Sequence, residues 1–264
     1  MAWRARCSGN LVLLAGMSML GAMRVGAKPM ARIPEGYFIP PFPSGGDSAG
    51  GQAKIRIPAF HIDAMPVTVG EYLTFLRQHP EWRKSRVKGI FADSAYLRSW
   101  KGDLQPSAKN PSAPATQVSW YAAKAYCESE GKRLPSTREW ERIAQTVPVG
   151  QDSAAYVEQV LEWYGRPASR DAPVGRGSNN AYGVRDLLGK IWEWTSDFNR
   201  EGPEGLASGD RNNSFFCGGA ARSAKPSGVD YATYMRFAMR SSLKPEFSTS
   251  SLGFRCAGDI ADGK

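Results

Sequence analysis

The stretch LGKIWEWTSDF, residues 188–198, places two tryptophans beside a glutamate, an aspartate and a lysine. A buried strand seldom carries Glu193 and Asp197, and a solvated loop seldom carries Trp192 and Trp194. Charged side chains that rings cover need partners, because an unpaired buried charge is costly. This stretch therefore predicts that its carboxylates are buried under the indole rings and have hydrogen-bond or ion-pair partners there.

The composition of the whole chain is that of a globular protein with long connections. The chain has 264 residues, of which 42% are hydrophobic and 22% are charged, and this balance favours a folded chain over a disordered one. Its 28 glycines, 18 prolines and 8 tryptophans favour a loop-rich fold over a helix bundle.

The net charge of +9 would allow an acidic partner, and residues 77–89 form the densest basic stretch. The remaining positive charge is spread along the chain, and no nucleic-acid motif is present. We therefore predict a solvated basic face and no nucleic-acid partner.

The amino terminus has the pattern of a targeting signal. Arg4 and Arg6 precede the apolar run of residues 11–23, and Val25 and Ala27 are small residues at positions −3 and −1 of a cleavage site. At about 13 residues, this run is short for a membrane span.

Cleavage after Ala27 would divide the chain into a signal peptide, residues 1–27, and a single exported domain, residues 28–264. We expect a periplasmic or secreted product with no membrane span after cleavage. An uncleaved amino-terminal anchor is the alternative.

Export changes how the cysteines are interpreted. If Cys7 leaves with the signal, an odd number remains in an oxidising compartment: Cys127, Cys217 and Cys256. One disulfide and one spare thiol follow.

Capping signals predict where the helices begin. Thr68 and Glu71 have the capping-box spacing, and Pro80 lies beyond the expected end of that helix. Ser119 is expected to cap a second helix that ends at Gly131.

Other segments vary in how much they indicate. A third helix is expected to begin at Ser136 or Thr137, with Trp140 and Ile143 facing inward. Residues 150–180 show no informative pattern. Strands are predicted at residues 31–42, 55–63 and 251–260. Residues 84–118 show little periodicity. Residues 231–242 could form either a helix or a strand.

Four segments, in this order, resemble the formylglycine-generating enzyme or sulfatase-modifying-factor family. The resemblance implies an α+β fold, a variant of the C-type-lectin-like architecture with little regular secondary structure. The segments are MPVTVGEYLTFL (65–76), VSWYAAKAYCESEGKRLPSTREWERIA (118–144), AYGVRDLLGKIWEWTSD (181–197) and SSLGFRCAGD (250–259).

In this family, the segment around Trp192, Glu193, Trp194 and Asp197 is a structural signature that helps to hold calcium. Here Lys190 stands where the family usually has asparagine. Because an ammonium cannot ligate calcium, we expect the lysine to replace the ion by pairing with Glu193 or Asp197.

The resemblance also implies a copper site. Cys217 falls at the first of two cysteines that hold Cu(I) in the family, and Ser214 at a nearby active-site serine. The second cysteine is absent, because its position carries Arg222 or, in another alignment, Ala232. Linear Cu(I) coordination needs both thiolates, so copper through Cys217 alone, a redox thiol and a relic remain open.

Family likeness further implies a disulfide between Cys127 and Cys256, which leaves Cys217 as the spare thiol. A second family disulfide would need cysteines at Ala144 and Phe237, and neither is present.

Other catalytic or metal sites are weakly indicated. The only histidines are His61 and His79, and neither has a recognisable partner. The remaining prediction is that Glu139, Glu141, Glu193 and Asp197 are structural partners of Arg133, Arg138, Arg185 and Arg240.

The resemblance implies an exported protein for oxidative modification or maturation of a periplasmic protein or small molecule, as in relatives linked to pyoverdine chromophore oxidation. One alternative is a non-catalytic, lectin-like binding module, and a second is a one-cysteine formylglycine-generating oxidase. The binding module would use loop aromatics: Trp82, Tyr96, Trp100, Phe215, Phe216, Tyr231 and Tyr234.

Overall fold

Three small sheets and five α-helices form the part of the chain that the computed structural model describes, residues 28–40, 54–165, 171–177, 179–199 and 228–260. The largest sheet is antiparallel, with β4 (Phe60–Asp63) between β1 (Met30–Ile33) and β7 (Ala257–Asp259). Mixed helix and sheet content agrees with the α+β class that we expected.

Two further sheets are two-stranded. In the first, β2 (Gly36–Phe38) pairs antiparallel with β3 (Ile55–Ile57). The second joins the Trp-Glu segment to the carboxyl-terminal region, because β5 (Trp192–Glu193) pairs in parallel with β6 (Leu252–Gly253). The predicted strand at residues 55–63 is therefore two strands that separate at Pro58 and Ala59, since proline has no backbone N–H for a ladder.

Local capping chemistry sets the start of the first two helices. Before α1 (Val69–Gln78), the Thr68 hydroxyl accepts from the Glu71 N–H at 3.2 Å, and the Glu71 carboxylate accepts from the Thr68 N–H at 2.7 Å. Ser119 caps α2 (Trp120–Ser129). After α2, Gly131 adopts a φ of +68°, a conformation that favours glycine. These predictions are confirmed.

The other elements resolve what the sequence left open. Ser136, and not Thr137, caps α3 (Thr137–Ala144). Residues 153–165, for which we had no prediction, form a helix. The remaining elements are the 3₁₀ turn η1 (Pro80–Trp82), α4 (Ser153–Gly165) and α5 (Gly228–Ser241).

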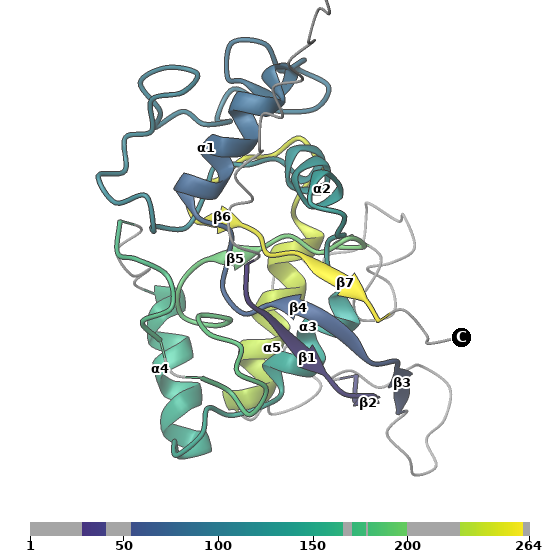
Figure 1. Cartoon of the computed structure of the whole chain (residues 1–264). Coiled ribbons are helices and arrows are strands. Elements are labelled where there is room, and N and C mark those ends of the chain that lie inside the picture. The colour runs from purple at the N-terminus through teal and green to yellow at the C-terminus, as the bar shows by residue number, and fades with distance from the viewer. Residues whose placement is uncertain (1–27, 41–53, 166–170, 178, 200–227, 261–264) are drawn as a thin grey trace, which may run out of the picture.

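Two hydrophobic clusters fill the interior. One surrounds α1 and α2, and the other lies between the sheets and α3. In Figure 1, α4 lies beside α5, on the opposite side of the β5–β6 pair from α1. Residues 84–118 carry turns and isolated bridges, with no helix or longer strand. No helix among the described residues combines the length and apolarity needed to cross a membrane.

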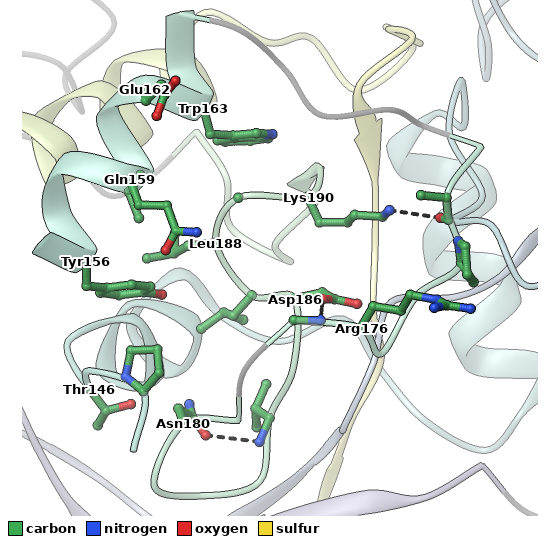
Figure 2. Close-up of a pocket in the computed structure, with 18 residues that line it drawn as sticks. Thr146, Tyr156, Gln159, Glu162, Trp163, Arg176, Asn180, Asp186, Leu188 and Lys190 are labelled. Atoms are coloured by element: carbon green, nitrogen blue, oxygen red, sulfur yellow. Dashed lines mark hydrogen bonds between the residues drawn. The ribbon is translucent and has the colours of Figure 1, made fainter. Parts of the chain in front are cut away.

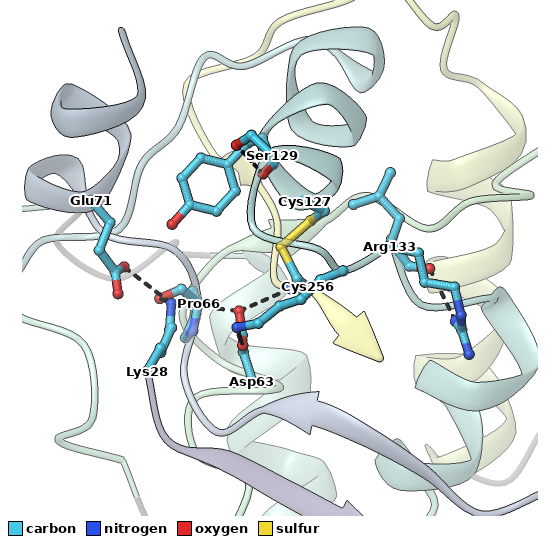
Figure 3. The surroundings of a disulfide bond; sticks show 11 residues. Lys28, Asp63, Pro66, Glu71, Cys127, Ser129, Arg133 and Cys256 are labelled. Carbon is cyan, nitrogen blue, oxygen red and sulfur yellow. Dashed lines mark hydrogen bonds and ion pairs between the residues drawn. A yellow bond between two sulfur atoms is a disulfide. The ribbon is translucent and has the colours of Figure 1, made fainter. Parts of the chain in front are cut away.

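A disulfide joins α2 to the start of β7, through Cys127 and Cys256 (Figure 3). This is the pairing that the family resemblance implied. Beside it, buried Asp63 accepts from the Lys132 ammonium at 2.7 Å and from the Cys256 N–H at 3.2 Å. The residue before β7 is therefore held to α2 by the disulfide and to β4 by the Asp63 carboxylate.

Candidate functional site

Glu193 lies at the centre of the Trp-Glu segment and is fully satisfied. Its carboxylate accepts from Arg255 Nε and Nη2, each at 2.8 Å, and from Trp140 Nε1 at 2.8 Å. The side chains of Glu193 and Arg255 have 0% exposure. A carboxylate occupied in this way is a structural partner and does not fit the role of a calcium ligand.

The rest of this signature is also structural. Trp194 is buried and donates from Nε1 to the Val118 carbonyl at 2.8 Å. Asp197 accepts from the Thr137 N–H at 2.7 Å and from the Thr137 hydroxyl at 2.9 Å. The segment therefore fastens the starts of α2 and α3 to β5.

Our prediction that Lys190 pairs with Glu193 or Asp197 is wrong. Arg255 fills that place for Glu193, because its planar fork matches both carboxylate oxygens where an ammonium cannot. Lys190 instead donates to the Ala172 carbonyl at 2.8 Å. Burial lowers the pKa of Lys190, and the nearby Asp186 carboxylate opposes this shift.

Other predicted ion pairs are partly confirmed. Arg133 binds Glu139 through two nitrogens, at 2.7 and 2.8 Å. Fully buried Glu141 pairs with Arg240, as expected, and also with Arg236, which we did not predict.

Arg185 has different partners from the carboxylates that we expected. It donates to the Gly175 carbonyl at 2.8 Å and to the side chain of Asn179. These contacts hold Arg185 against Gly175 and Asn179, within the segment before β5.

The predicted catalytic pair, Cys217 and Ser214, lies outside the described residues, as do the loop aromatics Phe215 and Phe216. Within the described part of the chain, no group of three His, Cys, Asp or Glu side chains is placed to hold a metal. Since Cys127 and Cys256 are joined, they cannot serve as thiolate ligands. Among the described residues, therefore, no two free thiolates are available for a copper site.

The two histidines are packed apart from each other. His61 lies in β4, opposite Arg32 in β1 and Gly258 in β7. His79 stacks on Phe75 with 4.7 Å between ring centroids, and its Nδ1 lies 3.4 Å from Glu81. These placements agree with packing roles for both side chains.

Some loop aromatics that we proposed as ligand contacts belong to the core. Tyr96 and Trp100 are buried, and the Tyr96 hydroxyl lies 2.6 Å from that of Tyr72. Burial raises the pKa of the Tyr96 phenol. These two side chains are therefore not surface contacts, whereas Tyr231 is exposed.

Trp192 forms an aromatic cluster with the end of α4. Its ring lies 5.2 Å from that of Trp163 and is stacked on that of Tyr164 at 5.0 Å, between centroids. Neither Trp163 nor Tyr164 was predicted from the sequence to belong to a site. The i, i+4, i+7 spacing of Tyr156, Val160 and Trp163 is the helical signal that could have found this face.

A cavity of about 570 Å³ lies between α4 and the segment of residues 172–190 (Figure 2). Tyr156, Val160 and Trp163 line it from the helix, while Leu188 and Lys190 line it from the segment. This volume is within the range of small-molecule sites, about 300–1,000 Å³.

Asp186 also lines this cavity. It adopts a φ of +53°, a left-handed conformation that is unusual for a residue other than glycine. Its carboxylate accepts from the Gly175 N–H and, at 2.9 Å, from the Gly177 N–H. The left-handed backbone at Asp186 is strained. The Asp186 carboxylate holds Gly175 and Gly177 and so closes the segment into a turn.

Two polar nitrogens in the cavity wall have no hydrogen-bond partner among the described residues. They are Trp163 Nε1 and Asn180 Nδ2, and each residue is 7% exposed. The side-chain oxygen of Asn180, Oδ1, accepts from the N–H groups of Tyr182 and Val184, each at 3.0 Å, and these bonds fix the orientation of the side-chain amide. Both unpaired atoms are therefore donors.

Comparisons with known proteins agree with the resemblance. A family model described as a sulfatase-modifying factor enzyme 1-like domain matches residues 19–260. The chain is 33% identical to "Formylglycine-generating enzyme" of Mus musculus over 176 residues, which cover 55% of this chain and 44% of that protein. The chain thus spans less than half the length of this relative.

The names of two other relatives state different activities. "Inactive C-alpha-formylglycine-generating enzyme 2" of Bos taurus is 26% identical over 271 residues, covering 86% of this chain and 87% of that protein. "Hercynine oxygenase" of Mycolicibacterium smegmatis is 30% identical over 164 residues, covering 54% of this chain and 38% of that protein.

Proposed function

Because the chain belongs to the sulfatase-modifying factor enzyme 1-like family, we propose that it is exported and acts in oxidative modification or maturation of a periplasmic protein or small molecule. In this proposal it does not make formylglycine. The domain has the C-type-lectin-like form of the α+β fold that the resemblance implies.

The disulfide between Cys127 and Cys256 is the observation that carries this proposal. The chain has four cysteines, and Cys7 lies in the predicted signal, so Cys217 is the one thiol left to the exported domain. A site that needs two thiolates cannot be completed within one such chain. Relatives include a protein named for oxygenase activity, which supports oxidative chemistry of another kind.

Metal content and free thiols, measured on mature protein from the periplasm, test this proposal. Wild type is compared with Cys217→Ser. Stoichiometric copper or iron that is lost in the variant would make Cys217 a metal ligand and support the oxidative role. A metal-free wild type with one inert thiol would overturn the oxidative role and favour a binding module.

A non-catalytic accessory module is the second function that an observation favours. The cavity beside α4 has the size of a ligand site, and one relative that aligns over most of the chain is named inactive. In this case, ligand binding would be unchanged in Cys217→Ser. The one-cysteine formylglycine oxidase differs from both, because it predicts conversion of a sulfatase peptide.

A further inference from the structure

The cavity between α4 and residues 172–190 holds two donors that folding alone leaves unsatisfied. Trp163 Nε1 and Asn180 Nδ2 are buried without a partner among the described residues. Buried donors nearly always find a partner, because leaving one unpaired forfeits its hydration. Two such donors in one cavity indicate a ligand with acceptor atoms, and they disfavour a cation.

The apolar and aromatic lining of the cavity suits a ligand with an aromatic ring. Tyr156, Val160 and Trp163 present one helical face, and Leu187 and Leu188 lie in the other wall. Figure 2 shows the rings of Tyr156 and Trp163 on the α4 side, with Asn180 at the lower end of the cavity. A ring can stack against these side chains with its polar groups directed at the donors.

Charge near the cavity favours an anionic group. Lys190 and Arg176 line it, together with Glu162 and Asp186. The Asp186 carboxylate is engaged by the N–H groups of Gly175 and Gly177, while Glu162 is exposed. The lining therefore carries two cationic side chains, one exposed carboxylate, and one carboxylate whose charge is already engaged by backbone N–H groups.

We propose that this cavity binds a small aromatic carboxylate that carries a second acceptor oxygen, the chemistry of an N-acylated aromatic amino acid. The ring packs on Tyr156 and Trp163, and the oxygens accept from Trp163 Nε1 and Asn180 Nδ2. This site does not depend on oxidation at Cys217, so it stands or fails separately from the proposed function.

Calorimetric titration with N-acetyl-L-phenylalanine tests the site in the mature protein, with N-acetyl-L-phenylalaninamide as the uncharged match. Trp163→Phe keeps a ring and removes the donor. Asn180→Asp keeps the acceptor for the N–H groups of Tyr182 and Val184 and replaces the donor with an anionic oxygen. Trp82→Phe and Asn110→Asp are the matched controls, because neither residue lines the cavity.

Binding of the carboxylate is expected to weaken roughly tenfold in Trp163→Phe and by more than that in Asn180→Asp. The controls should bind like wild type, and the amide should bind more weakly than the acid. The indole N–H resonance that disappears in Trp163→Phe should shift on titration of the wild type, which reports on the donor directly.

No binding of the carboxylate by wild type would overturn the proposal. Equal binding of the acid and the amide would overturn the proposal that the site prefers an anionic ligand. Wild-type affinity in both cavity variants would show that Trp163 Nε1 and Asn180 Nδ2 do not bind the ligand. Circular dichroism of each variant shows that a lost affinity is not lost folding.

Discussion

Glu193 and Arg255 form a two-point ion pair inside the protein, with Nε to Oε2 and Nη2 to Oε1 distances of 2.8 Å and no exposure of either side chain. Arg255 Nη2 also donates to the Arg185 carbonyl at 3.0 Å, just before Asp186. The pair therefore connects β5, the region before β7 and the segment that lines the cavity.

Removing one member of this pair should destabilise the fold strongly. Glu193→Gln leaves the Arg255 guanidinium buried without its counter-charge, which costs about 3–5 kcal/mol. Urea unfolding measures this loss. The control is Glu35→Gln, which breaks the exposed Glu35–Arg56 pair and should leave the unfolding midpoint unchanged. Equal effects of the two variants would contradict the structural role of Glu193.

The disulfide should contribute more than any single hydrogen bond. Cys127 and Cys256 are 129 residues apart, and closing a loop of that length stabilises a fold by about 4–5 kcal/mol in the chain-entropy model. Cys127→Ala combined with Cys256→Ala should lower the free energy of unfolding by that order. Thiol titration of unfolded, unreduced mature protein should find one thiol, and finding three would show that the bridge does not form.

Acid should weaken the contact between α3 and α5. Burial of Glu141 opposes its ionisation, yet the guanidiniums of Arg236 and Arg240 outweigh this and hold its pKa below the ordinary value. A lowered folded-state pKa gives stability that is present above the ordinary value, about 4.3, and is lost as pH falls through the folded value.

Glu141→Gln should therefore flatten the dependence of unfolding free energy on pH in the acid range. Urea unfolding between about pH 7 and about pH 3 measures this slope. Glu128→Gln is the control, because Glu128 pairs with Lys124 on the exposed face of α2. An unchanged slope in Glu141→Gln would show that this carboxyl does not titrate with folding.

Asp186 should be replaceable by asparagine more easily than by alanine. Asp186→Ala removes the acceptor for two N–H groups and places alanine at a φ of +53°, at a cost of about 2–3 kcal/mol. Asparagine tolerates this conformation and keeps one acceptor oxygen. Similar unfolding midpoints for the two variants would rule out the role of this carboxylate in closing the segment.

Features set by neighbouring residues could be predicted from the sequence. The capping box of Thr68 and Glu71 spans only four consecutive residues, so its pattern could be recognised in the sequence, whereas the choice between Ser136 and Thr137 needed the structure. The start of α4 was missed, although it carries a local signal: Asp152 precedes the helix, and its carboxylate accepts from the Ala155 N–H.

Features set by distant residues required the structure. Glu193 and Arg255 are 62 positions apart, and nothing near Glu193 in the sequence shows that Arg255, and not Lys190, is its partner. The cavity donors are another case, because Trp163 and Asn180 belong to separate segments that only packing brings together. Cys217 and Ser214 stay predictions, since they lie outside the described residues.

The most direct measurement is the conversion of a peptide containing the sulfatase cysteine motif, with Cu(I), reductant and oxygen present, followed by mass spectrometry. The mouse relative named formylglycine-generating enzyme serves as the positive control. Cys127 and Cys256 are joined, and the proposed removal of Cys7 with the signal would leave Cys217 as the one thiol, so we predict no formylglycine from the wild-type protein. Conversion by wild type that is lost in Cys217→Ser would contradict this and establish a one-cysteine mechanism.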